Sequence, residues 1–598
     1  MSATSEQNGA ISNALNNNLL CAAPGSGKTF TLVKIALEIL AENKSNRICL
    51  VTFTNSGVQE MQERLSKSLT PEQLNRVKVA TFHSLFLQQA KSTFKGSLLI
   101  GASQSNFIDR LQRQLGIKFY DEVKEAIDTV GMELDRTAFE NTKEGGIFKA
   151  YQDLKKNNQK YDLDDVARRA VAGMIKNKIS PFSYTHFLVD EFQDTDEIQF
   201  RWLMEHYRQT GACFTVVADD DQSIYSFRGA LGYDILLKFQ EETKASLHLL
   251  SKCFRCRPEI LSAAYNMIEF NENRIAKSVT SAKPAGGTFE IYTHETNYAQ
   301  YKVFEKDFID NPGEWAILCR TNKLLDTASL QLTSLGIKHR VSNAKSIWDT
   351  RQADFVLKFL YCLRFPHAGG KYIGEILGFL RESESNILEI QSRVASANGL
   401  HHIQLGTDDG YKHATEVYFG YLHDWFDNTN SENDIRVKVK TIKALFSLAK
   451  NGRGAIKAKN IGIESSVLDI LYSMKGSWYD RIDYLLLNLN KKKDKKGNTD
   501  SNEVVLTTFH GSKGLEYEFL AIFDFIQGVS PSSRSLEQDA INKSSQSLSE
   551  ERRLAFVAMT RAMEKLFIHT YERRENADTG DTTRVKTSEF VEEILYEE

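Results

Sequence analysis

The stretch AAPGSGKT, residues 22–29, restricts the fold of this chain more than any other feature of its sequence. It follows the apolar run Leu19–Ala22 and precedes the helical pattern FTLVKIALEILAEN, so the order is strand, glycine-rich turn and helix. This order fits the phosphate-binding loop pattern, with Ala22 where the first glycine often stands. Such a unit forms part of a parallel sheet covered by helices, and it therefore predicts an α/β fold.

The same stretch predicts a site for nucleotide phosphates. Gly25 and Gly27 let backbone N–H groups curl around phosphate oxygens, and the N-terminus of the following helix adds partial positive charge. Lys28 is expected to reach the β- and γ-phosphates, and Thr29 to ligate Mg²⁺. The residues predicted to bind the nucleotide here are Ala23, Pro24, Gly25, Ser26, Gly27, Lys28 and Thr29.

The stretch FLVDEFQD, residues 187–194, predicts the second half of such a site. An apolar strand that ends in Asp-Glu, downstream of a phosphate-binding loop, is typical of nucleotide hydrolysis. Asp190 is expected to hold Mg²⁺ through water, and Glu191 to activate the attacking water. Together the two stretches predict an NTPase, and Glu191 argues against a nucleotide-binding domain that has lost turnover.

Short apolar runs that end in loops recur along the chain. They are compact rather than alternating, as buried parallel strands are, and helical stretches such as 56–67 and 549–563 lie between them. Two regions, about 96–179 and about 366–497, are instead mostly helical, so each α/β core is expected to carry one helical insertion. The predicted strands are Leu19–Ala22, Ile48–Thr52, Phe187–Val189, Phe214–Val217, Ala316–Leu318, Val504–Thr507, Phe519–Phe523 and Leu566–His569.

The composition narrows the compartment and the partners. A chain of 598 residues is too long for one core, so three to five domains are expected. Seven cysteines are too few for a disulfide scaffold, and no apolar run approaches 18 residues, which together predict a cytoplasmic protein without a membrane partner. The polar start also lacks a signal pattern. A net charge of −3 argues against a generally basic surface for nucleic acid, but not against a local basic groove.

A cysteine pair and a basic run are interpreted without a binding role. The pair Cys253 and Cys256 has no other ligands at zinc-site spacing, so a metal role for it is disfavoured. The basic run NKKKDKKGNTDSNE, residues 490–503, is interpreted as a solvated linker in preference to a phosphate-binding patch.

The loop VVADDDQSIYSFRGA, residues 216–230, joins an apolar strand to acids, an amide, two aromatics and an arginine. Together with DEFQD it resembles the UvrD/Rep/PcrA group of superfamily 1 DNA helicases, which move 3′ to 5′ on single-stranded DNA. The resemblance covers nearly the whole chain, with motifs in the family's order and spacing. The other matching motifs are SEQ (5–7), TFTNSGVQEM (52–61), TFHSL (81–85), LSKCFRCRPEIL (250–261), AILCRTN (316–322), VVLTTFHGSKGLEYEFL (504–520) and EERRLAFVAMTRA (550–562).

The resemblance implies two RecA-like motor domains with parallel sheets, each with a mostly α-helical insertion. The expected bounds are 1–95 with 180–262 for the first motor domain, 96–179 for its insertion, 263–365 with 498–598 for the second motor domain, and 366–497 for its insertion.

The resemblance also implies how ATP is bound and hydrolysed. Gln7 matches an adenine-reading residue, Phe254 one that stacks on adenine, and Glu516 one that reads the sugar. Arg255 and Arg561 match two arginines that stabilise charge on the γ-phosphoryl group, and both are expected in or at the edge of the second α/β core, across a cleft from the phosphates. Taken alone, Arg561 would be better read as a cation at a helix terminus.

The loop 216–230 is expected to connect the phosphate with DNA. Gln222 matches a residue on the γ-phosphate side, and Asp219 is expected to support the magnesium site. Asp220 and Asp221 are interpreted as turn-formers or helix caps.

On the DNA side, Phe53, Tyr225 and Phe227 match stacking or strand-contact positions. An aromatic face stacks on any base, so it grips a strand without reading its sequence. His83 and His510 would, taken alone, more often be structural. The other residues expected to contact DNA are Thr54, Thr81, His83, Arg228, Thr508 and His510.

The sequence therefore predicts an ATP- and Mg²⁺-dependent 3′→5′ helicase or translocase that acts on single-stranded DNA and on junctions of single and double strands. Three alternatives stay open. The first is an ATPase that displaces proteins from DNA without processive unwinding, and the second is a regulatory subunit of a defence or other complex, with an unknown protein partner. The third, a kinase or transporter ATPase, is disfavoured because it leaves the aromatic–arginine loop unexplained.

Overall fold

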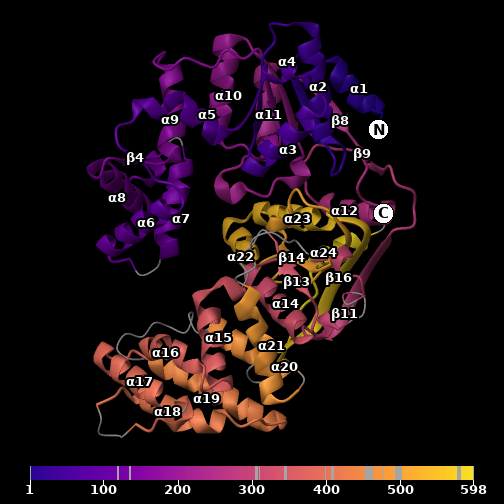
Figure 1. The fold of residues 1–598 in the computed structure, drawn as a ribbon. Coiled ribbons are helices and arrows are strands. Elements are labelled where there is room, and N and C mark those ends of the chain that lie inside the picture. The colour runs from indigo at the N-terminus through magenta and orange to yellow at the C-terminus, as the bar shows by residue number, and fades with distance from the viewer. Residues whose placement is uncertain are drawn as a thin grey trace. The chain divides into compact units, whose positions relative to one another are not determined.

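The computed structural model describes residues 2–117, 120–133, 136–302, 308, 310–342, 347–397, 399–405, 410–450, 462–474, 476–491, 502–575 and 581–596. The chain forms two compact units. Unit 1 comprises Met1–Gly287, Arg534–Thr560 and Glu593–Glu598, and unit 2 comprises Thr288–Ser533 and Arg561–Glu592. Each unit contains a parallel sheet covered by helices and a separate group of helices (Figure 1). The predicted α/β fold with two parallel sheets is confirmed.

The sheet of unit 1 is parallel throughout, and its four inner strands are buried on both faces. Leu19 packs with α5, α9, α10 and α11 on one face, whereas the next residue, Leu20, packs with α1, α2 and α3 on the other. Burial on both sides explains why these strands are continuous apolar runs. In sheet order the strands are β3 (Val77–Thr81), β2 (Ile48–Thr52), β6 (His186–Val189), β7 (Cys213–Ala218), β1 (Asn18–Ala22) and β8 (Ser246–Leu250).

Ten helices and one strand pair complete the described α/β part of unit 1. They are α1 (Ser5–Ser12), α2 (Lys28–Glu42), α3 (Asn55–Ser66), α4 (Pro71–Leu74), α5 (Phe82–Ala90), α10 (Glu197–Thr210), α11 (Tyr233–Thr243), α12 (Pro258–Ile268), α22 (Ser533–Asn542), α23 (Gln546–Met559), β9 (Lys252–Cys253) and β10 (Thr280–Ser281).

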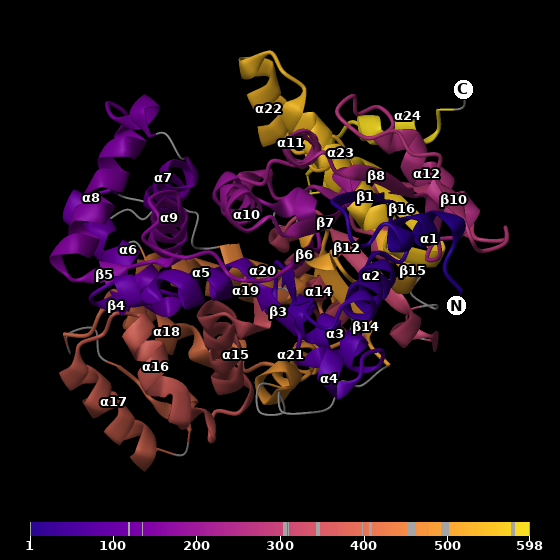
Figure 2. The same cartoon turned by 90° about the horizontal axis from the view of Figure 1, so that it is seen from above.

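The region 96–179 is mostly helical, and part of it packs as its own core. Helices α6 (Ala102–Leu115), α7 (Tyr120–Met132) and α8 (Lys143–Asn157) lie beside α9 (Figure 2). Their buried side chains form one core that includes Tyr151. Helix α9 (Leu163–Ile175) instead packs against the sheet of unit 1, where Val166 and Met174 are buried. The short strands β4 (Ser97–Leu98) and β5 (Lys160–Tyr161) pair at the base of this region.

Helix α23 belongs to unit 1, although the expected domain bounds assign residues 534–560 to the second motor domain. Its Phe556 meets Tyr265 of α12 edge to face, with ring centroids 5.3 Å apart. Its buried Arg552 donates to both carboxylate oxygens of Glu593 and to Asn271. Unit 1 likewise extends to Gly287 rather than to residue 262. The helix ends at Met559, not at 563, because a strand begins at Ala562.

The sheet of unit 2 is parallel except for its last strand, β17 (Thr582–Arg584), which pairs antiparallel with β16. Helix α14 (Asn322–Ser334) packs on this sheet, and α24 (Glu589–Ile594) lies near the end of the chain. In sheet order the other strands are β11 (Thr288–Thr296), β16 (Ala562–Glu575), β15 (Tyr517–Ile522), β12 (Trp315–Cys319), β14 (Val504–Thr508) and β13 (His339–Val341).

The helices of unit 2 share one large core that includes Phe359, Trp425 and Trp478. Residues before the expected bound at 366 already belong to this core, among them Leu330 of α14, Trp348 and several side chains of α15. Residues 492–501 of the basic run predicted as a linker lie outside the described residues. The helices are α15 (Arg351–Arg364), α16 (Ile373–Phe379), α17 (Glu384–Ser396), α18 (His413–Trp425), α19 (Glu432–Lys450), α20 (Gly462–Ser473) and α21 (Trp478–Lys491).

Among the described residues, every helix is too short or too polar to cross a membrane.

Candidate functional site

The loops with the predicted phosphate-site residues leave the same edge of the unit 1 sheet. The neighbouring strands β6, β7, β1 and β8 are parallel, so their carboxyl ends lie together. The phosphate-binding loop follows β1, the pair Asp190 and Glu191 follows β6, and the loop that starts at Asp219 follows β7. Sheet order thus gathers three segments that are far apart in the sequence.

The phosphate-binding loop has a conformation in which side chains at its glycine positions would meet neighbouring residues. Gly25 and Gly27 both have left-handed backbone conformations, with φ of +63° and +80°. A Cβ on residue 25 would lie 2.6 Å from Cβ of Arg255, and one on residue 27 would lie 3.0 Å from Nε2 of Gln7. The hydroxyl of Ser26 is buried and has no hydrogen-bond partner among the described residues. These features fit a loop whose polar groups bind phosphate oxygens.

Gln7 is fixed beside this loop by the start of α1. Thr4 and Gln7 form a capping box, in which each side chain bonds to the other's backbone N–H. The remaining amide nitrogen of Gln7 donates to the carbonyl of Ser26 at 3.0 Å. The carboxylate of Glu6 accepts a hydrogen bond from the backbone N–H of Ser251 at 2.9 Å, which is a second contact that holds this helix. The predicted adenine-reading residue is therefore in contact with the phosphate loop.

Asp190 and Glu191 form a strained acidic turn after β6. Glu191 has a φ of +51°, which is rare outside glycine, and its N–H donates to Oδ1 of Asp190 at 3.0 Å. Burial and the adjacent Glu191 carboxylate raise the pKa of Asp190 to about 7, against the opposing charge of Lys28. Strain of about 1–3 kcal/mol at such a residue persists only where the surroundings hold it, which is common in active sites.

The oxygen ligands present suit a magnesium ion. Thr29 lies in the first turn of α2, next to Lys28, and Asp190 supplies a carboxylate at the same sheet edge. Hydroxyl and carboxylate oxygens are the ligands that Mg²⁺ prefers. A nearby divalent cation also favours the ionised form of a carboxyl group whose pKa is raised.

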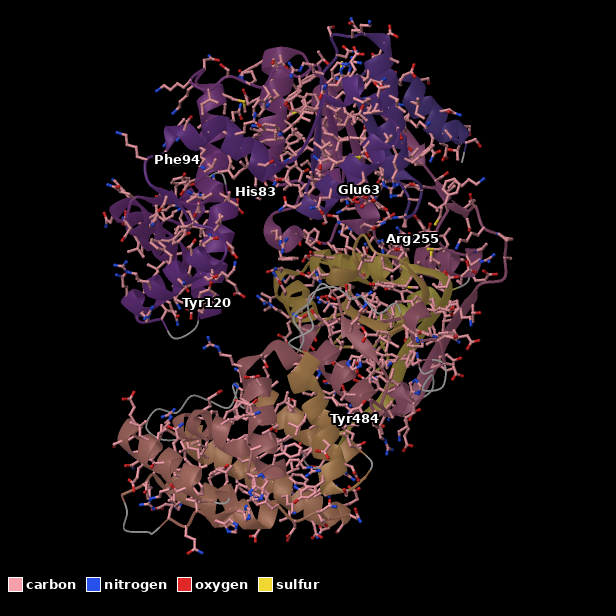
Figure 3. The ribbon with its side chains drawn as sticks, viewed as in Figure 1. Glu63, His83, Phe94, Tyr120, Arg255 and Tyr484 are labelled. Atoms are coloured by element: carbon pink, nitrogen blue, oxygen red, sulfur yellow. The ribbon has the colours of Figure 1, made fainter. Side chains whose placement is uncertain are left out.

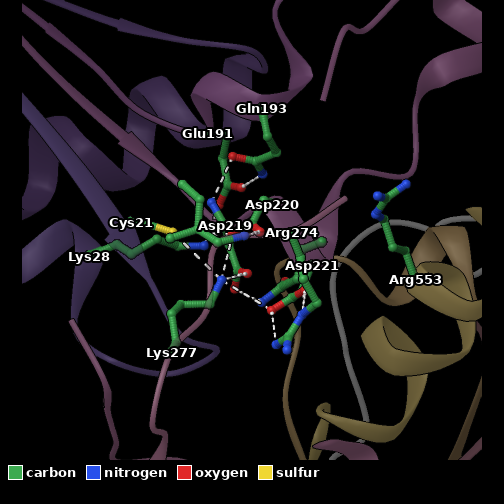
Figure 4. A network of polar contacts seen from close by, with 12 residues as sticks. Cys21, Lys28, Glu191, Gln193, Asp219, Asp220, Asp221, Arg274, Lys277 and Arg553 are labelled. Atoms are coloured by element: carbon green, nitrogen blue, oxygen red, sulfur yellow. Dashed lines mark hydrogen bonds and ion pairs between the residues drawn. The ribbon is translucent and has the colours of Figure 1, made fainter. Parts of the chain in front are cut away.

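A chain of hydrogen bonds joins Glu191 to the loop after β7 (Figure 4). The amide nitrogen of Gln193 donates to Oε2 of Glu191 at 2.6 Å, and its amide oxygen accepts from the N–H of Asp219 at 3.0 Å. Oδ2 of Asp219 in turn accepts from Nε2 of Gln222 at 2.6 Å. Gln193 was not among the predicted site residues, although its place in DEFQD, two residues after Glu191, was a usable signal.

Arg255, which Figure 3 labels, belongs to unit 1, as does Phe254. Both residues lie beside the phosphate-binding loop. The N–H of Phe254 donates to the carbonyl of Gly25 at 2.9 Å. Arg255 donates to the carbonyl of Thr560, at the C-terminal end of α23, at 3.2 Å. Arg255 lies in unit 1, as the expected bound at residue 262 implies, and not in the second core, because β8 pairs with β1 and carries the following residues to the loop.

Asp220 and Asp221 do lie in a short 3₁₀ turn, Asp220–Gln222, but their side chains have a further role that we did not expect. Both side chains are buried, and they form ion pairs with Lys277 and Arg274. Two cations from one segment balance these acids, a pairing between residues more than 50 positions apart that local sequence patterns do not indicate.

The predicted DNA-contact residues near β2 and β3 have mixed surroundings. Thr54 caps α3 by accepting from Gly57, and Thr81 caps α5 by accepting from Ser84, so both hydroxyls have structural partners. Phe53 is half-buried against Phe82, with ring centroids 5.5 Å apart. His83 is exposed on α5 (Figure 3).

Tyr225, Phe227 and Arg228 form an exposed cluster just past Gln222. The two rings meet edge to face at 5.9 Å, and the guanidinium of Arg228 lies 5.2 Å and 5.4 Å from their centroids. Phe227 is 57% exposed, which is high for phenylalanine. Ser226, between them, donates to Glu550 of α23. The loop thus presents an aromatic ring and a cation to solvent.

The remaining predicted residues belong to unit 2. The hydroxyl of Thr508 accepts from the N–H of Gly511, and His510 begins the following turn. Arg561 is buried and donates to the carbonyl of Leu515, next to the exposed Glu516. Arg561 and Glu516 are therefore neighbours, while the phosphate-loop residues lie in unit 1.

Two protein families match the chain. The AAA domain family matches residues 7–228, and the UvrD-like helicase C-terminal domain family matches residues 406–573. Among similar proteins, the ATP-dependent DNA helicase PcrA of Bacillus subtilis (strain 168) is 25% identical, over 96% of this chain and 83% of its own length. The ATP-dependent DNA helicase Rep of Buchnera aphidicola subsp. Schizaphis graminum is 24% identical, over 100% and 97%. DNA helicase II of Escherichia coli (strain K12) is 25% identical, over 99% and 87%.

Proposed function

We propose that this chain, which belongs to the UvrD-like helicase family, is an ATP-dependent DNA helicase that moves 3′ to 5′ on single-stranded DNA and opens junctions of single and double strands. The observation that carries the proposal is the loop after β7. Asp219 and Gln222 at its start are bonded to Gln193 and thus to Glu191, and Tyr225 and Phe227 follow within five residues of Gln222. A segment this short can transmit a small shift at the phosphates to an exposed stacking surface.

Residues of unit 1 have the chemistry that hydrolysis requires. Lys28 reaches the transferred phosphoryl group, and Glu191 orients and deprotonates the attacking water. Gln222 contacts the γ-phosphate side, and Arg255 supplies a guanidinium next to the loop. Thr29 and Asp190 would hold Mg²⁺, which would add positive charge at the phosphate oxygens. The role that the family resemblance gives Arg561 stays a prediction, as do those of Thr508, His510 and Glu516.

The nucleotide base has its own contacts. Gln7 reads the adenine edge with its amide, and Phe254 stacks on the ring. Both residues contact the phosphate-binding loop directly, Gln7 through Ser26 and Phe254 through Gly25. We infer that the site prefers ATP over nucleotides whose base lacks that hydrogen-bonding edge.

The proposed contacts bind the DNA strand without recognising its base sequence. Tyr225 and Phe227 stack on bases, and Arg228 adds a charge that attracts phosphates. Phe53, Thr54, Thr81 and His83 extend this contact, with the caps of α3 and α5 holding the two threonines in place.

The experiment that tests the proposal is ATP hydrolysis with and without single-stranded DNA, followed by unwinding of duplexes with 3′ or 5′ tails. We expect stimulation by single-stranded DNA and unwinding of the 3′-tailed duplex alone. Displacement of streptavidin without unwinding would instead support the protein-displacing ATPase. Hydrolysis that is indifferent to DNA would contradict both.

A further inference from the structure

Lys277 lies in the interior of unit 1, between α12 and β10, and its side chain is fully buried. Its ammonium group contacts three consecutive carboxylates of the loop after β7 (Figure 4). The distances from Nζ are 2.5 Å to Oδ1 of Asp220, 3.0 Å to Oδ2 of Asp221 and 3.7 Å to Oδ1 of Asp219. Buried acids in this number need cations close by, because uncompensated buried charge is strongly destabilising.

The segment around Lys277 holds the loop at further points. Arg274 donates through Nε and a terminal nitrogen to the two carboxylate oxygens of Asp221, at 3.0 Å and 3.1 Å. The N–H of Ile275 donates to Oδ2 of Asp220 at 2.6 Å. Paired hydrogen bonds of this kind fix orientation as well as charge.

Lys277 also connects the loop to the strand that leads into the phosphate-binding loop. Its Nζ lies 3.6 Å from Sγ of Cys21 in β1, and Cys21 donates to Oδ1 of Asp220 at 3.1 Å. One ammonium group is therefore shared by β1 and by the loop after β7.

The charges of this cluster reinforce one another. Burial alone lowers the pKa of Lys277, yet the three aspartates raise it well above its ordinary value. For Asp221 the directions are reversed: burial raises its pKa, but the nearby cations Lys277 and Arg274 hold that pKa below its usual range. The ion pair between Lys277 and Asp221 is thus present at neutral pH.

The loop held in this way carries residues of the proposed hydrolytic site. Asp219 accepts from Gln222 and donates its N–H to Gln193, which bonds to Glu191. The position of Asp219 therefore affects the amide of Gln222 and the carboxylate of Glu191 together.

We propose that Lys277 is a positioning residue for ATP hydrolysis, which holds the loop Asp219–Gln222 so that Gln222 and Glu191 keep their orientation toward the γ-phosphate. The proposal rests on the proposed function of the site. It assigns Lys277 no contact with ATP or DNA.

The test is Lys277→Met, which keeps the length of the side chain and removes its charge. Lys155→Met is the matched control, because Lys155 is also buried and pairs with two aspartates, Asp162 at 2.6 Å and Asp165 at 2.7 Å, in the helical part of the same unit. Both full-length variants are assayed for kcat and KM of ATP hydrolysis at a temperature where circular dichroism shows them folded. Equilibrium binding of ADP and of AMP-PNP provides a readout without turnover.

We expect Lys277→Met to lower kcat by about ten- to a hundredfold, the scale of a small misplacement of reacting groups, with little change in KM. The ratio of its affinities for AMP-PNP and ADP should become smaller, because the displaced Gln222 no longer contacts the third phosphate. Lys155→Met should keep both properties. An equal loss of kcat in both variants, or an unchanged kcat in Lys277→Met, overturns the proposal.

If Lys277→Met does not fold, the double variant Lys277→Met with Asp220→Asn removes one buried charge of each sign. It should fold and still show the lower kcat, and a wild-type kcat in it overturns the proposal. Loss of the proposed DNA function is a separate outcome. If ATP hydrolysis by the wild-type protein does not respond to DNA, the proposed helicase function is contradicted. Lys277→Met and Lys155→Met can still be compared by their basal ATP hydrolysis and their nucleotide binding, so the role of Lys277 is tested separately.

Discussion

The ammonium group of Lys28 lies 3.5 Å from Oε1 of Glu191, so the lysine of the phosphate-binding loop is paired with the proposed general base. Both side chains are partly shielded from water, with exposures of 14% and 30%. This contact holds the carboxylate of Glu191 next to the lysine of the phosphate-binding loop. ATP phosphates that attract Lys28 would then free the carboxylate for water.

Replacing Glu191 by Gln should lower kcat of ATP hydrolysis by at least about a hundredfold, because the general base is lost. ATP binding should be retained, since the amide keeps the shape of the side chain. Steady-state ATPase assays and titration with a fluorescent ATP analogue check the two parts. Glu241→Gln, on the exposed side of α11, is the control and should behave as wild type. Near-normal turnover in Glu191→Gln would remove Glu191 from the mechanism.

Replacing Gly25 by Ala should weaken ATP binding. The new Cβ would lie 2.6 Å from Cβ of Arg255, and the backbone φ of +63° is unfavourable for alanine. Strain of about 1–3 kcal/mol corresponds to a loss of affinity of roughly ten- to a hundredfold. The control is Gly9→Ala in α1, where a Cβ meets no atom within 4 Å and nucleotide titrations should give the wild-type affinity. Equal affinities for the two variants would show that the loop relaxes around Arg255.

Replacing Phe227 by Ala should weaken binding of single-stranded DNA and slow unwinding, while KM for ATP stays unchanged. Loss of one stacked base contact costs about 1–3 kcal/mol. Fluorescence anisotropy with a labelled oligonucleotide measures the first effect, and a tailed-duplex assay the second. Phe270→Ala removes another exposed phenylalanine of unit 1, 47% exposed and packed on Tyr596, and should leave DNA binding intact. If both variants bind DNA equally well, the stacking role of Phe227 is wrong.

Acid should destabilise unit 1 through His206. This residue is fully buried between Trp202 and Phe182, and burial lowers its pKa to about 4. Between pH 4 and the ordinary His pKa of about 6.5 the unfolded chain binds more protons than the folded one, so stability falls as the pH falls through this window. The full effect is at most about 3 kcal/mol.

Thermal unfolding followed between pH 4 and 7 measures this dependence. In His206→Phe the slope below pH 6.5 should be smaller than in the wild type. His413→Phe, at a position whose side chain is 74% exposed, should keep the wild-type slope. Parallel curves for all three proteins would mean that other groups govern the acid response.

Much of the fold follows from local patterns in the sequence. The apolar runs that we predicted as strands are strands, with ends shifted by a few residues and with β16 much longer than predicted. Nine of the seventeen described strands were not predicted. Among them are β8 and β11, because SLHLL and TFEIYTHET include polar residues at exposed positions of edge strands. The helix predicted over 549–563 ends at Met559, because Ala562 already pairs with Tyr517 of β15.

Residues of the candidate site could be predicted from the sequence where a short local motif contains them. The glycines of the phosphate-binding loop and the Asp-Glu after a strand each have a physical requirement that a few neighbouring residues satisfy. Lys277 lacked such a signal, because its importance arises from partners reached through the fold. Gln193 stands inside a local motif, but its bond to Asp219 also becomes visible only in the fold. The roles of the individual site residues remain predictions that the variants above test.

What the order of amino acids established is therefore the set of parts: apolar runs that become buried parallel strands, a strand–loop–helix unit shaped for phosphate, and an exposed aromatic–arginine loop. These follow from backbone conformation and from the period of apolar residues, both of which act over short stretches. Strand pairing and burial then placed Arg255 against Gly25, α23 in unit 1, and Lys277 among Asp219, Asp220 and Asp221. Such contacts depend on which surfaces exclude water together, and charges more than 50 residues apart find each other only once packing has removed the solvent between them.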